Sequence, residues 1–253
     1  MAQADPRSFA AVWQSQVSEQ GPKPFLTFYD EGTGERVELS YRTFDNWLAK
    51  TGNLIQDELS AEPGDRIALH ARPHWLTAVW AVAPLLTGAV LAPWGDPDGA
   101  LAVVAGPESL VDVRAAAGGS AADLWALSLL PLGLPFPQVP EGFRDFAAEV
   151  RAHGDRFAPF DPPSGRGAAL AGADGTELTH QALVEAVRDA GRKATDRLLV
   201  STSRDEFTAA ELIDWLYAPA GAGASIVLVR GADQARLDQI AASERTTGAY
   251  SLN

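Results

Sequence analysis

The chain of 253 residues is long enough to bury a sizeable core, and its 46% apolar and 21% charged residues exclude a disordered protein. A net charge of −13 removes the electrostatic basis for binding nucleic acid or anionic membrane surfaces, which requires clustered Lys and Arg. The absence of Cys excludes disulfides, thiolate nucleophiles and Cys-ligated zinc, and it fits a reducing compartment.

The first part of the chain predicts alternating helices and strands. No basic region followed by an apolar one opens the sequence, so we expect no secretory signal and a cytoplasmic location. Turn and capping residues, such as the glycines of DEGTGE and Ser40, separate the apolar patterns. The predicted elements are a helix over 9–17, a hairpin of 25–29 and 36–39, a helix from Ser40 to Leu59, a strand at 66–70, a helix at 74–87 and a strand at 89–92.

The segment from Trp75 to Trp94 raises the question of a membrane span. Its twenty residues carry no charge, which reaches the length of a membrane-spanning helix. Pro84 and Gly88 interrupt the run, however, and parallel sheets covered on both faces also produce such apolar stretches. We therefore expect a buried helix followed by a buried strand, and no membrane association.

The second part of the chain continues the alternation. Four prolines between Pro131 and Pro140 predict an extended surface connection, and the Pro/Gly-rich loop 157–167 offers the best internal boundary. Around them lie predicted strands at 101–105, 125–129, 168–171, 197–202 and 225–230, and predicted helices at 107–117, 143–150, 179–194, 208–217 and 234–243.

This order of elements predicts an α/β fold of mainly parallel sheets flanked by helices, with a small N-terminal hairpin. We expect a first α/β subdomain over 1–160 and a second, shorter one over 161–253.

Motifs for nucleotide, acyl-transfer and metal chemistry are absent from the sequence. It contains neither GxxxxGK[ST] nor GxSxG. His70 and His74 are four residues apart, but Pro73 prevents the continuous helical face that a shared metal would need. We therefore expect no metal site.

Several segments resemble the adenylate-forming superfamily, which includes the acyl-CoA synthetases and other AMP-binding enzymes. They are LSYRTFDNWLAKTGNLIQDEL, PGDRIALHARPHWLTAVWAVAPLLTGAVLAPWGDPD, LTHQALVEAV and DRLLVSTSRDEFTAAELIDWLYAPAGAGASIVLV, in the order in which the family has its counterparts. With LGLPFPQVPEGFRDFAAEVRAHGDRF, the chain is most similar to a short, uncharacterised actinobacterial branch. The resemblance implies the fold of the N-terminal subdomains of acyl-CoA synthetases.

The resemblance also places an eroded phosphate loop at ALAGADGTELTH. The family holds the ATP phosphates with TSGTTGxPKG, whereas this segment has no Ser and no Lys, and it contains Asp174 and Glu177. Two carboxylates would repel a polyphosphate at short range. The residues left for a nucleotide are Gly172, Gly175, Thr176 and His180, which leave room for weak AMP or ATP binding, and the alternative is a tight loop into a helix capped by Thr179.

No residue of this chain matches the family's catalytic groups. The family's Tyr-Gly-x-Thr-Glu motif, its ribose-binding Asp and its C-terminal catalytic Lys would follow the end of this sequence, and we expect a truncated homologue. None of Lys23, Lys50 and Lys193 lies in a Gly-rich loop. Without that cation, charge developing on the α-phosphate is not offset.

Two residues remain as candidates for binding the acyl substrate. Arg204, in the segment where relatives face their substrate, has the charge to pair with a carboxylate, and the alternative is a solvated turn after a strand. Trp94 lies near a turn, where we expect a pocket or interface residue, whereas the other Trp residues fit the core.

The sequence is compatible with three functions. The leading expectation is a non-catalytic relative of AMP-binding enzymes that acts as a small-molecule binding or protein-interaction module without a cofactor. The second is an enzyme of unusual chemistry whose partner supplies the missing domain. The third is a structural subunit of a homodimer or complex, in which another chain covers an apolar face.

Overall fold

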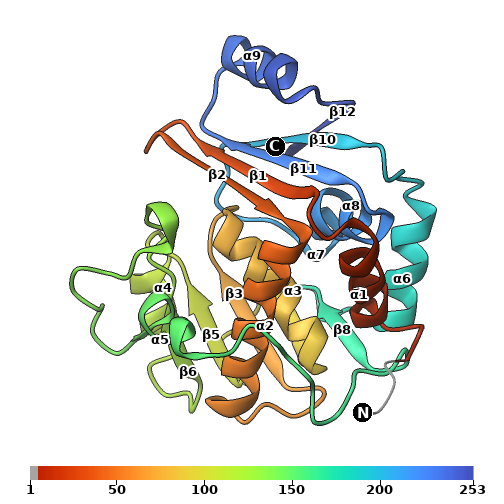
Figure 1. Ribbon diagram of the computed structural model, residues 1–253. Helices are drawn as coiled ribbons and strands as arrows, with labels where there is room; N and C mark the ends of the chain where they lie inside the picture. Colours follow the sequence, from red (N-terminus) through yellow and green to blue (C-terminus); the bar gives the residue numbers. More distant parts are fainter. Residues whose placement is uncertain (1–4, 253) are drawn as a thin grey trace.

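The computed structural model describes residues 5–252, so the first four residues of the expected subdomain 1–160 and the last of 161–253 lie outside it. Two β-sheets lie one above the other with a layer of helices between them (Figure 1). We call the five-stranded sheet, of order β12-β10-β11-β1-β2, sheet A, and the seven-stranded sheet, of order β7-β6-β5-β3-β4-β8-β9, sheet B.

Sheet A combines strands from the two ends of the chain. The predicted hairpin is present, because β1 pairs antiparallel with β2, while β1 also pairs in parallel with β11. β10 pairs in parallel with both β11 and β12. The strands are β1 (Pro24–Asp30), β2 (Glu35–Ser40), β10 (Arg197–Thr202), β11 (Ser225–Arg230) and β12 (Gly248–Leu252).

Sheet B is parallel except for its last strand, β9, which pairs antiparallel with β8. The carboxyl ends of its parallel strands therefore meet along one edge, which we call the carboxyl edge. The strands are β3 (Arg66–His70), β4 (Val90–Pro93), β5 (Ala102–Ala105), β6 (Asp123–Ala126), β7 (Arg144–Asp145), β8 (Ala168–Ala171) and β9 (Glu177–Thr179).

The helices between the sheets build the main core. Short side chains that cap their first turns explain where several begin: Ser40 accepts a hydrogen bond from Thr43 N at the start of α2, and Thr179 accepts one from Ala182 N at the start of α6. α9 covers the outer face of sheet A, and α4 packs on the outer face of sheet B. The helices are α1 (Phe9–Gln20), α2 (Tyr41–Asp57), α3 (Trp75–Thr87), α4 (Leu110–Ala116), α5 (Phe146–Glu149), α6 (His180–Asp189), α7 (Ala209–Leu212), α8 (Ala218–Ala222) and α9 (Gln234–Glu244).

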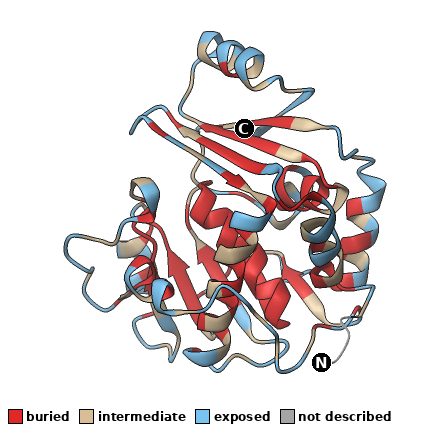
Figure 2. Cartoon of the chain, viewed as in Figure 1, coloured by how far each residue is buried: buried red, intermediate tan, exposed pale blue. Residues whose placement is uncertain are grey.

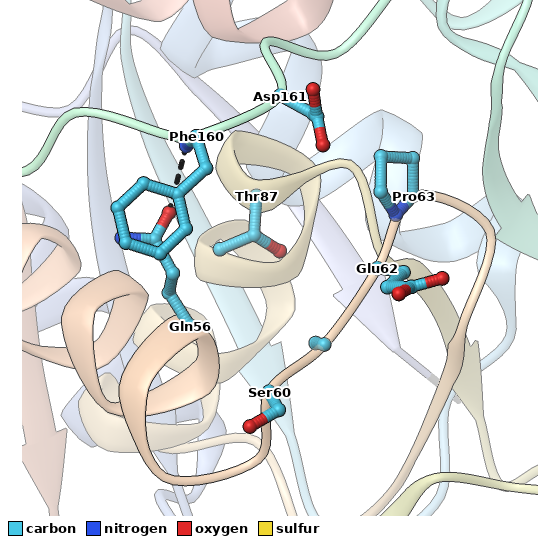
Figure 3. A pocket seen from close by; sticks show the side chains of 8 residues that line it. Gln56, Ser60, Glu62, Pro63, Thr87, Phe160 and Asp161 are labelled. Carbon is cyan, nitrogen blue, oxygen red and sulfur yellow. Dashed lines mark hydrogen bonds between the residues drawn. The ribbon is translucent and has the colours of Figure 1, made fainter.

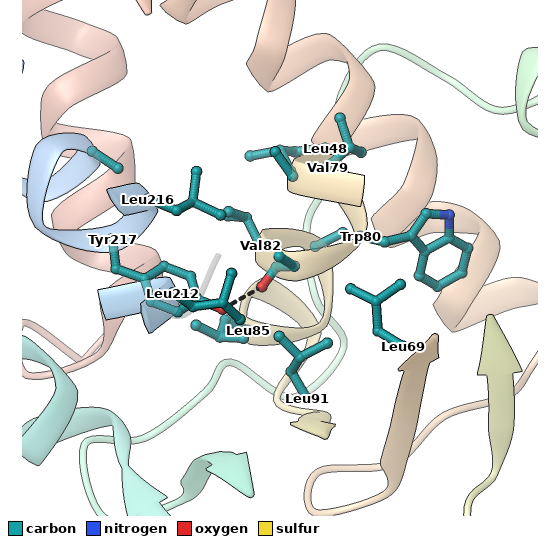
Figure 4. Close-up of a cluster of buried hydrophobic side chains, with 14 of the residues drawn as sticks. Leu48, Leu69, Val79, Trp80, Val82, Leu85, Leu91, Leu212, Leu216 and Tyr217 are labelled. Carbon is teal, nitrogen blue, oxygen red and sulfur yellow. Dashed lines mark hydrogen bonds between the residues drawn. The ribbon is translucent and has the colours of Figure 1, made fainter. Parts of the chain in front are cut away.

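α3 explains the uncharged segment that reaches membrane-spanning length. All of its residues are buried, and it lies between the two sheets (Figure 2). Tyr217 donates a hydrogen bond to the carbonyl oxygen of Ala81 at 2.6 Å, within a cluster that includes Trp80, Leu85 and Leu216 (Figure 4). Within residues 5–252 no helix has the length and apolarity needed to cross a membrane. The prediction of a buried helix followed by a buried strand is confirmed.

Most predicted elements are confirmed, and the differences are local. β6 begins at Asp123 rather than Trp125, and α6 ends at Asp189, five residues early. The helix predicted over 208–217 is α7 followed by a π-helical turn that continues into α8. β7, β9 and β12 were not predicted, and β7 occupies the start of the helix predicted over 143–150. The α/β class with mostly parallel strands is confirmed, and each sheet takes strands from both sides of the boundary expected at 160/161.

Candidate functional site

The carboxyl edge of sheet B brings together most of the residues that the sequence singled out. The chain passes from β3 to β4 on one side and then returns to place β5 on the other side of β3. In open parallel sheets, ligands bind outside the carboxyl ends of strands at such a reversal. This edge is therefore the first candidate for a binding site.

Trp94 and His70 lie side by side at this edge. Trp94 follows β4 directly and has a φ of 51°, a left-handed conformation that is strained for a side chain of this size. Its indole ring lies 5.2 Å from the imidazole of His70, whose Nε2 is 2.7 Å from the carbonyl oxygen of Gly95. The Trp94 Nε1–H is buried and has no hydrogen-bond partner among residues 5–252.

The charge of His70 is set by its surroundings. Burial lowers its pKa below the usual value, while the hydrogen bond to Gly95 and the charge of Glu206 act in the opposite direction. The imidazole is therefore neutral at pH 7. Glu206, whose charge acts on His70, belongs to the loop that follows β10 of sheet A.

A second pair of charged residues continues the edge beyond His70. Arg72 follows β3 and Glu108 follows β5, and Glu108 accepts a hydrogen bond from the backbone N–H of Arg72. The guanidinium Nη1 lies 3.5 Å from Glu108 Oε2. Arg72 Nε and Glu108 Oε2 are both buried without a hydrogen-bond partner in the described chain. Such groups are uncommon in a folded protein, and they mark a place where a bound molecule would find donors and acceptors.

The segment that corresponds to a phosphate loop is a short turn between β8 and β9. Gly172 N donates to the carbonyl oxygen of Thr176 at 2.8 Å, and Gly175 N donates to that of Gly172 at 3.0 Å. Asp174 Oδ1 accepts from both the N–H and the hydroxyl of Thr176, at 3.0 and 2.7 Å. These hydrogen bonds hold the pKa of Asp174 below its usual value, so the carboxylate stays charged. These donors form hydrogen bonds within the turn and are therefore not available to a bound anion.

His180 follows β9 and is buried at the start of α6. It begins α6 and is 1% exposed, and its Nδ1 accepts a hydrogen bond from Phe9 N at 3.4 Å. Burial lowers the pKa of His180 to about 4, which keeps the imidazole neutral. The structure thus brings Gly172, Gly175 and Thr176 together in one turn and places His180 against the start of α1.

Arg204 follows β10 and is held by Glu206 of its own loop and by Glu211 of α7. Its guanidinium lies 3.2 Å from Glu211 and donates to the carbonyl oxygen of Glu206 at 3.0 Å. Glu211 in turn completes the capping box of α7 with Thr208. A substrate carboxylate at Arg204 would therefore compete with an existing ion pair.

Sequence reasoning missed two groups of residues. One is the pair Arg72 and Glu108, which come from different strands of sheet B. The other is Glu35, 7% exposed, with His74, which is fully buried. Neither pair carries a local sequence signal, because the partners meet only in the folded chain. Within residues 5–252, no three His, Asp or Glu side chains lie together as metal ligands.

Comparison with known proteins identifies relatives of this chain. No family model matches it. A protein of Mycobacterium tuberculosis (strain ATCC 25618 / H37Rv) described as a "TIGR03089 family protein" is 38% identical over 233 residues, which cover 88% of this chain and 90% of that protein.

Solved structures of synthetases share the fold. An acyl-CoA synthetase of Brucella canis has a TM-score of 0.78 at 18% identity, over 96% of this chain and 47% of that one. A benzoate CoA ligase of Burkholderia xenovorans LB400 has a TM-score of 0.74 at 18% identity, over 96% and 50%. The N-terminal domain of FACL13 from M. tuberculosis has a TM-score of 0.71 at 16% identity, over 95% and 62%. This chain spans about half the length of the first two proteins, and identities this low establish the fold alone.

Proposed function

The chain belongs to the TIGR03089 family and has the fold of the acyl-CoA synthetases, and from this premise we propose that it binds a small molecule at the carboxyl edge of sheet B without adenylating it. Adenylation needs a site that holds a triphosphate and stabilises charge on its α-phosphate. The groups that the β8–β9 turn presents to a phosphate are the basis of this proposal.

The closed β8–β9 turn is the observation that carries the proposal. Its glycine N–H groups are bonded to carbonyl oxygens of the turn, and the Thr176 hydroxyl is bonded to Asp174. An incoming phosphate would have to break these bonds and would then meet a carboxylate, which repels it. Residues 168–180 contain no Lys or Arg that could offset this repulsion.

The neighbouring strand ends supply groups that suit binding. The strained Trp94 presents a large apolar ring with one donor that has no hydrogen bond, and Arg72 and Glu108 each present one polar atom without a hydrogen bond. A ligand with an aromatic or apolar part and a few hydrogen-bonding groups matches this set.

ATP–pyrophosphate exchange with a panel of carboxylic acids tests the catalytic half of the proposal. We expect no exchange above background and no rise in melting temperature with ATP, since a ligand that binds only the folded state must stabilise it. A robust exchange rate with any acid would refute the proposal.

A small-molecule screen followed by nuclear magnetic resonance tests the binding half. We expect ligands that perturb the indole signal of Trp94 in the wild type and bind more weakly to Trp94→Phe. Ligands that bind equally well to both proteins would place the site elsewhere.

The second candidate function is an adenylating enzyme completed by another chain. It is favoured by the fold that this chain shares with an acyl-CoA synthetase and a benzoate CoA ligase. Here ATP would raise the melting temperature by an amount set by its concentration relative to Kd, which the first proposal does not expect.

Association with a second copy or another protein also remains a proposal. Exposed apolar side chains gather on the proline-rich connection, where Leu132 is 72%, Leu134 48% and Val139 45% exposed. Light scattering that shows a monomer at high concentration would argue against a homodimer.

A further inference from the structure

A cavity lies away from the carboxyl edge, where α1, α2 and the end of α3 meet the segment 153–163. It has a volume of about 490 Å³, within the range of small-molecule sites. We call the segment 153–163 the strap. It is the stretch that follows α5 and runs past α2 toward β8 (Figure 1). Because α3 reaches the cavity with Leu86 and the strap leads into the start of β8, the cavity lies at the amino ends of the sheet B strands.

The walls of the cavity are mainly apolar. Ala10 and Ala49 line it from α1 and α2, Leu86 lines it from α3, and Phe157 and Pro159 line it from the strap. An apolar group of a ligand inside the cavity would be removed from water on all these sides. This favours its binding in proportion to the apolar area that is covered.

The strap is fixed to α2 and forms a preorganised wall. Lys50 donates to the carbonyl oxygen of His153 at 2.6 Å and pairs with Asp155 at 2.9 Å. Asn53 donates to the carbonyl oxygens of residues 154 and 156, at 3.1 and 3.0 Å. A Cβ at residue 52 would lie 3.0 Å from Phe157 Cγ, so the ring packs directly on a glycine of the helix. The cavity therefore does not depend on a ligand to hold its walls apart.

The far end of the strap continues this attachment. Phe160 N donates to Gln56 Oε1 at 2.9 Å, beside a smaller cavity of about 270 Å³ (Figure 3). That smaller cavity is lined by Glu62 and Asp161 as well as by Ala61, Pro63 and Phe160, and Phe160 is 79% exposed. The larger cavity is lined by the exposed Asp155 and Arg156 of the strap, and it combines apolar walls with one half-buried charge.

This charge belongs to Asp45. Its Oδ1 accepts hydrogen bonds from Trp13 Nε1 at 2.8 Å and from Gln14 Nε2 at 3.2 Å. No cationic side chain within residues 5–252 forms an ion pair with it. Burial raises the pKa of Asp45, although the two hydrogen bonds act in the opposite direction. A partly buried carboxylate without a counter-ion favours a cationic partner.

We propose that this cavity binds a small amine that carries an apolar group, with the ammonium against Asp45 and the apolar group between Leu86, Phe157 and Pro159. We expect a free carboxylic acid of the same shape to bind less well than the amine, because it would place a further negative charge beside Asp45. The net charge of −13 on the whole chain also favours the approach of a cationic ligand.

Titration with benzylamine, benzyl alcohol and phenylacetate tests this site, with the indole N–H signal of Trp13 as the reporter. This N–H is bonded to Asp45, so a bound ammonium must shift its signal. We expect saturable shifts with benzylamine, about tenfold weaker binding of benzyl alcohol and none of phenylacetate. Equal affinity for the amine and the alcohol, or no shift of the Trp13 signal at millimolar benzylamine, would overturn the proposal.

Three variants make the test specific. Asp45→Asn keeps an oxygen that can accept the hydrogen bond from Trp13, and it should weaken the binding of benzylamine about tenfold. Asp57→Asn removes the same charge from the exposed end of α2 and should bind as the wild type does. Ala158→Trp, at an exposed position of the wall, should obstruct the cavity with Asp45 intact, and it serves if Asp45→Asn does not fold. Wild-type affinity in Asp45→Asn or Ala158→Trp would overturn the proposal.

Discussion

Glu35 shows how a single buried charge is accommodated in this fold. Its carboxylate accepts hydrogen bonds from Trp75 Nε1 and Leu132 N, both at 3.2 Å, and from His74 Nε2 at 3.4 Å. His74 Nδ1 accepts from Leu76 N, so Nε2 carries the hydrogen that points to Glu35. Burial raises the pKa of Glu35, but these hydrogen bonds outweigh it and hold the pKa below its usual value. One carboxylate thus joins β2, α3 and the proline-rich connection.

Glu35→Gln should destabilise the protein at pH 7 by about 2 kcal/mol, because the amide accepts through one oxygen and turns an N–H group toward donors. Urea unfolding monitored by circular dichroism measures this change. Glu141→Gln, which breaks an exposed pair with Arg114, is the control and should cost less than about 1 kcal/mol. Equal effects of the two substitutions would contradict the role assigned to Glu35.

His180 predicts how stability depends on pH. Its pKa is about 4 in the fold and near 6.5 in the unfolded chain, so between these values the unfolded state binds the extra proton. Stability should therefore fall as the pH drops below about 6.5, by about 2 kcal/mol at pH 5 from this residue alone. His180→Gln should lose less stability than the wild type between pH 7 and pH 5 in chemical unfolding. Parallel pH profiles for the two proteins would show that His180 is not the group responsible.

At the scale of elements, the connection from α3 to β4 depends on one glycine. α3 ends at Thr87, and Gly88 takes a φ of 89°, a left-handed conformation that glycine adopts without steric cost. The next residues enter β4 without an intervening loop. This tight reversal keeps the helix packed directly on the strand that follows it.

Gly88→Ala should therefore destabilise the protein by about 1 to 2 kcal/mol. The added methyl group would be strained at this φ and would lie 3.4 Å from Pro63 Cβ. Gly119→Ala is the matched control, because its φ is not positive and no atom lies within 4 Å of the added Cβ. In thermal unfolding, the melting temperature of Gly88→Ala should be well below that of Gly119→Ala. The reverse order would rule out this explanation of the turn.

At the scale of the whole molecule, local patterns in the sequence predicted most elements and few of their partners. Caps such as Ser40 and Thr179 and the apolar periodicity of α2 act within a few residues, so they can be recognised without the fold. β12 could not be predicted, since most of its residues are exposed or half-buried and its pairing with β10 spans distant residues. Long-range pairing, rather than local preference, defines such an edge strand.

The candidate sites divide in the same way. The missing Lys of the phosphate loop could be recognised from the sequence, but the hydrogen bonds that close the turn on Asp174 exist only in the folded chain. Glu35 and His74 are 39 positions apart, and the strap meets α2 across about a hundred residues. Side chains that assemble over such separations leave no spacing that a single sequence can show.

Strand exchange between the two parts of the chain leads to a prediction about how it folds. β1 pairs in parallel with β11 from Leu26 to Asp30, so sheet A cannot form from residues 1–160 or from 161–253 alone. Separating them would expose the inner faces of both strands, including Phe28 and Leu228, which are fully buried. We therefore expect each fragment, expressed alone, to lack a cooperative unfolding transition, because little of its apolar surface would be covered.

Cleavage of the intact protein provides the control for this experiment. A protease site inserted in the exposed part of the strap near 160 should give a nicked protein whose two pieces elute together and unfold in one transition, since the strand pairing survives the cut. A well-dispersed NMR spectrum from isolated 1–160 would contradict this view and would make the first subdomain an independent folding unit. The two outcomes decide whether the boundary at 160/161 separates folding units or only marks a surface loop.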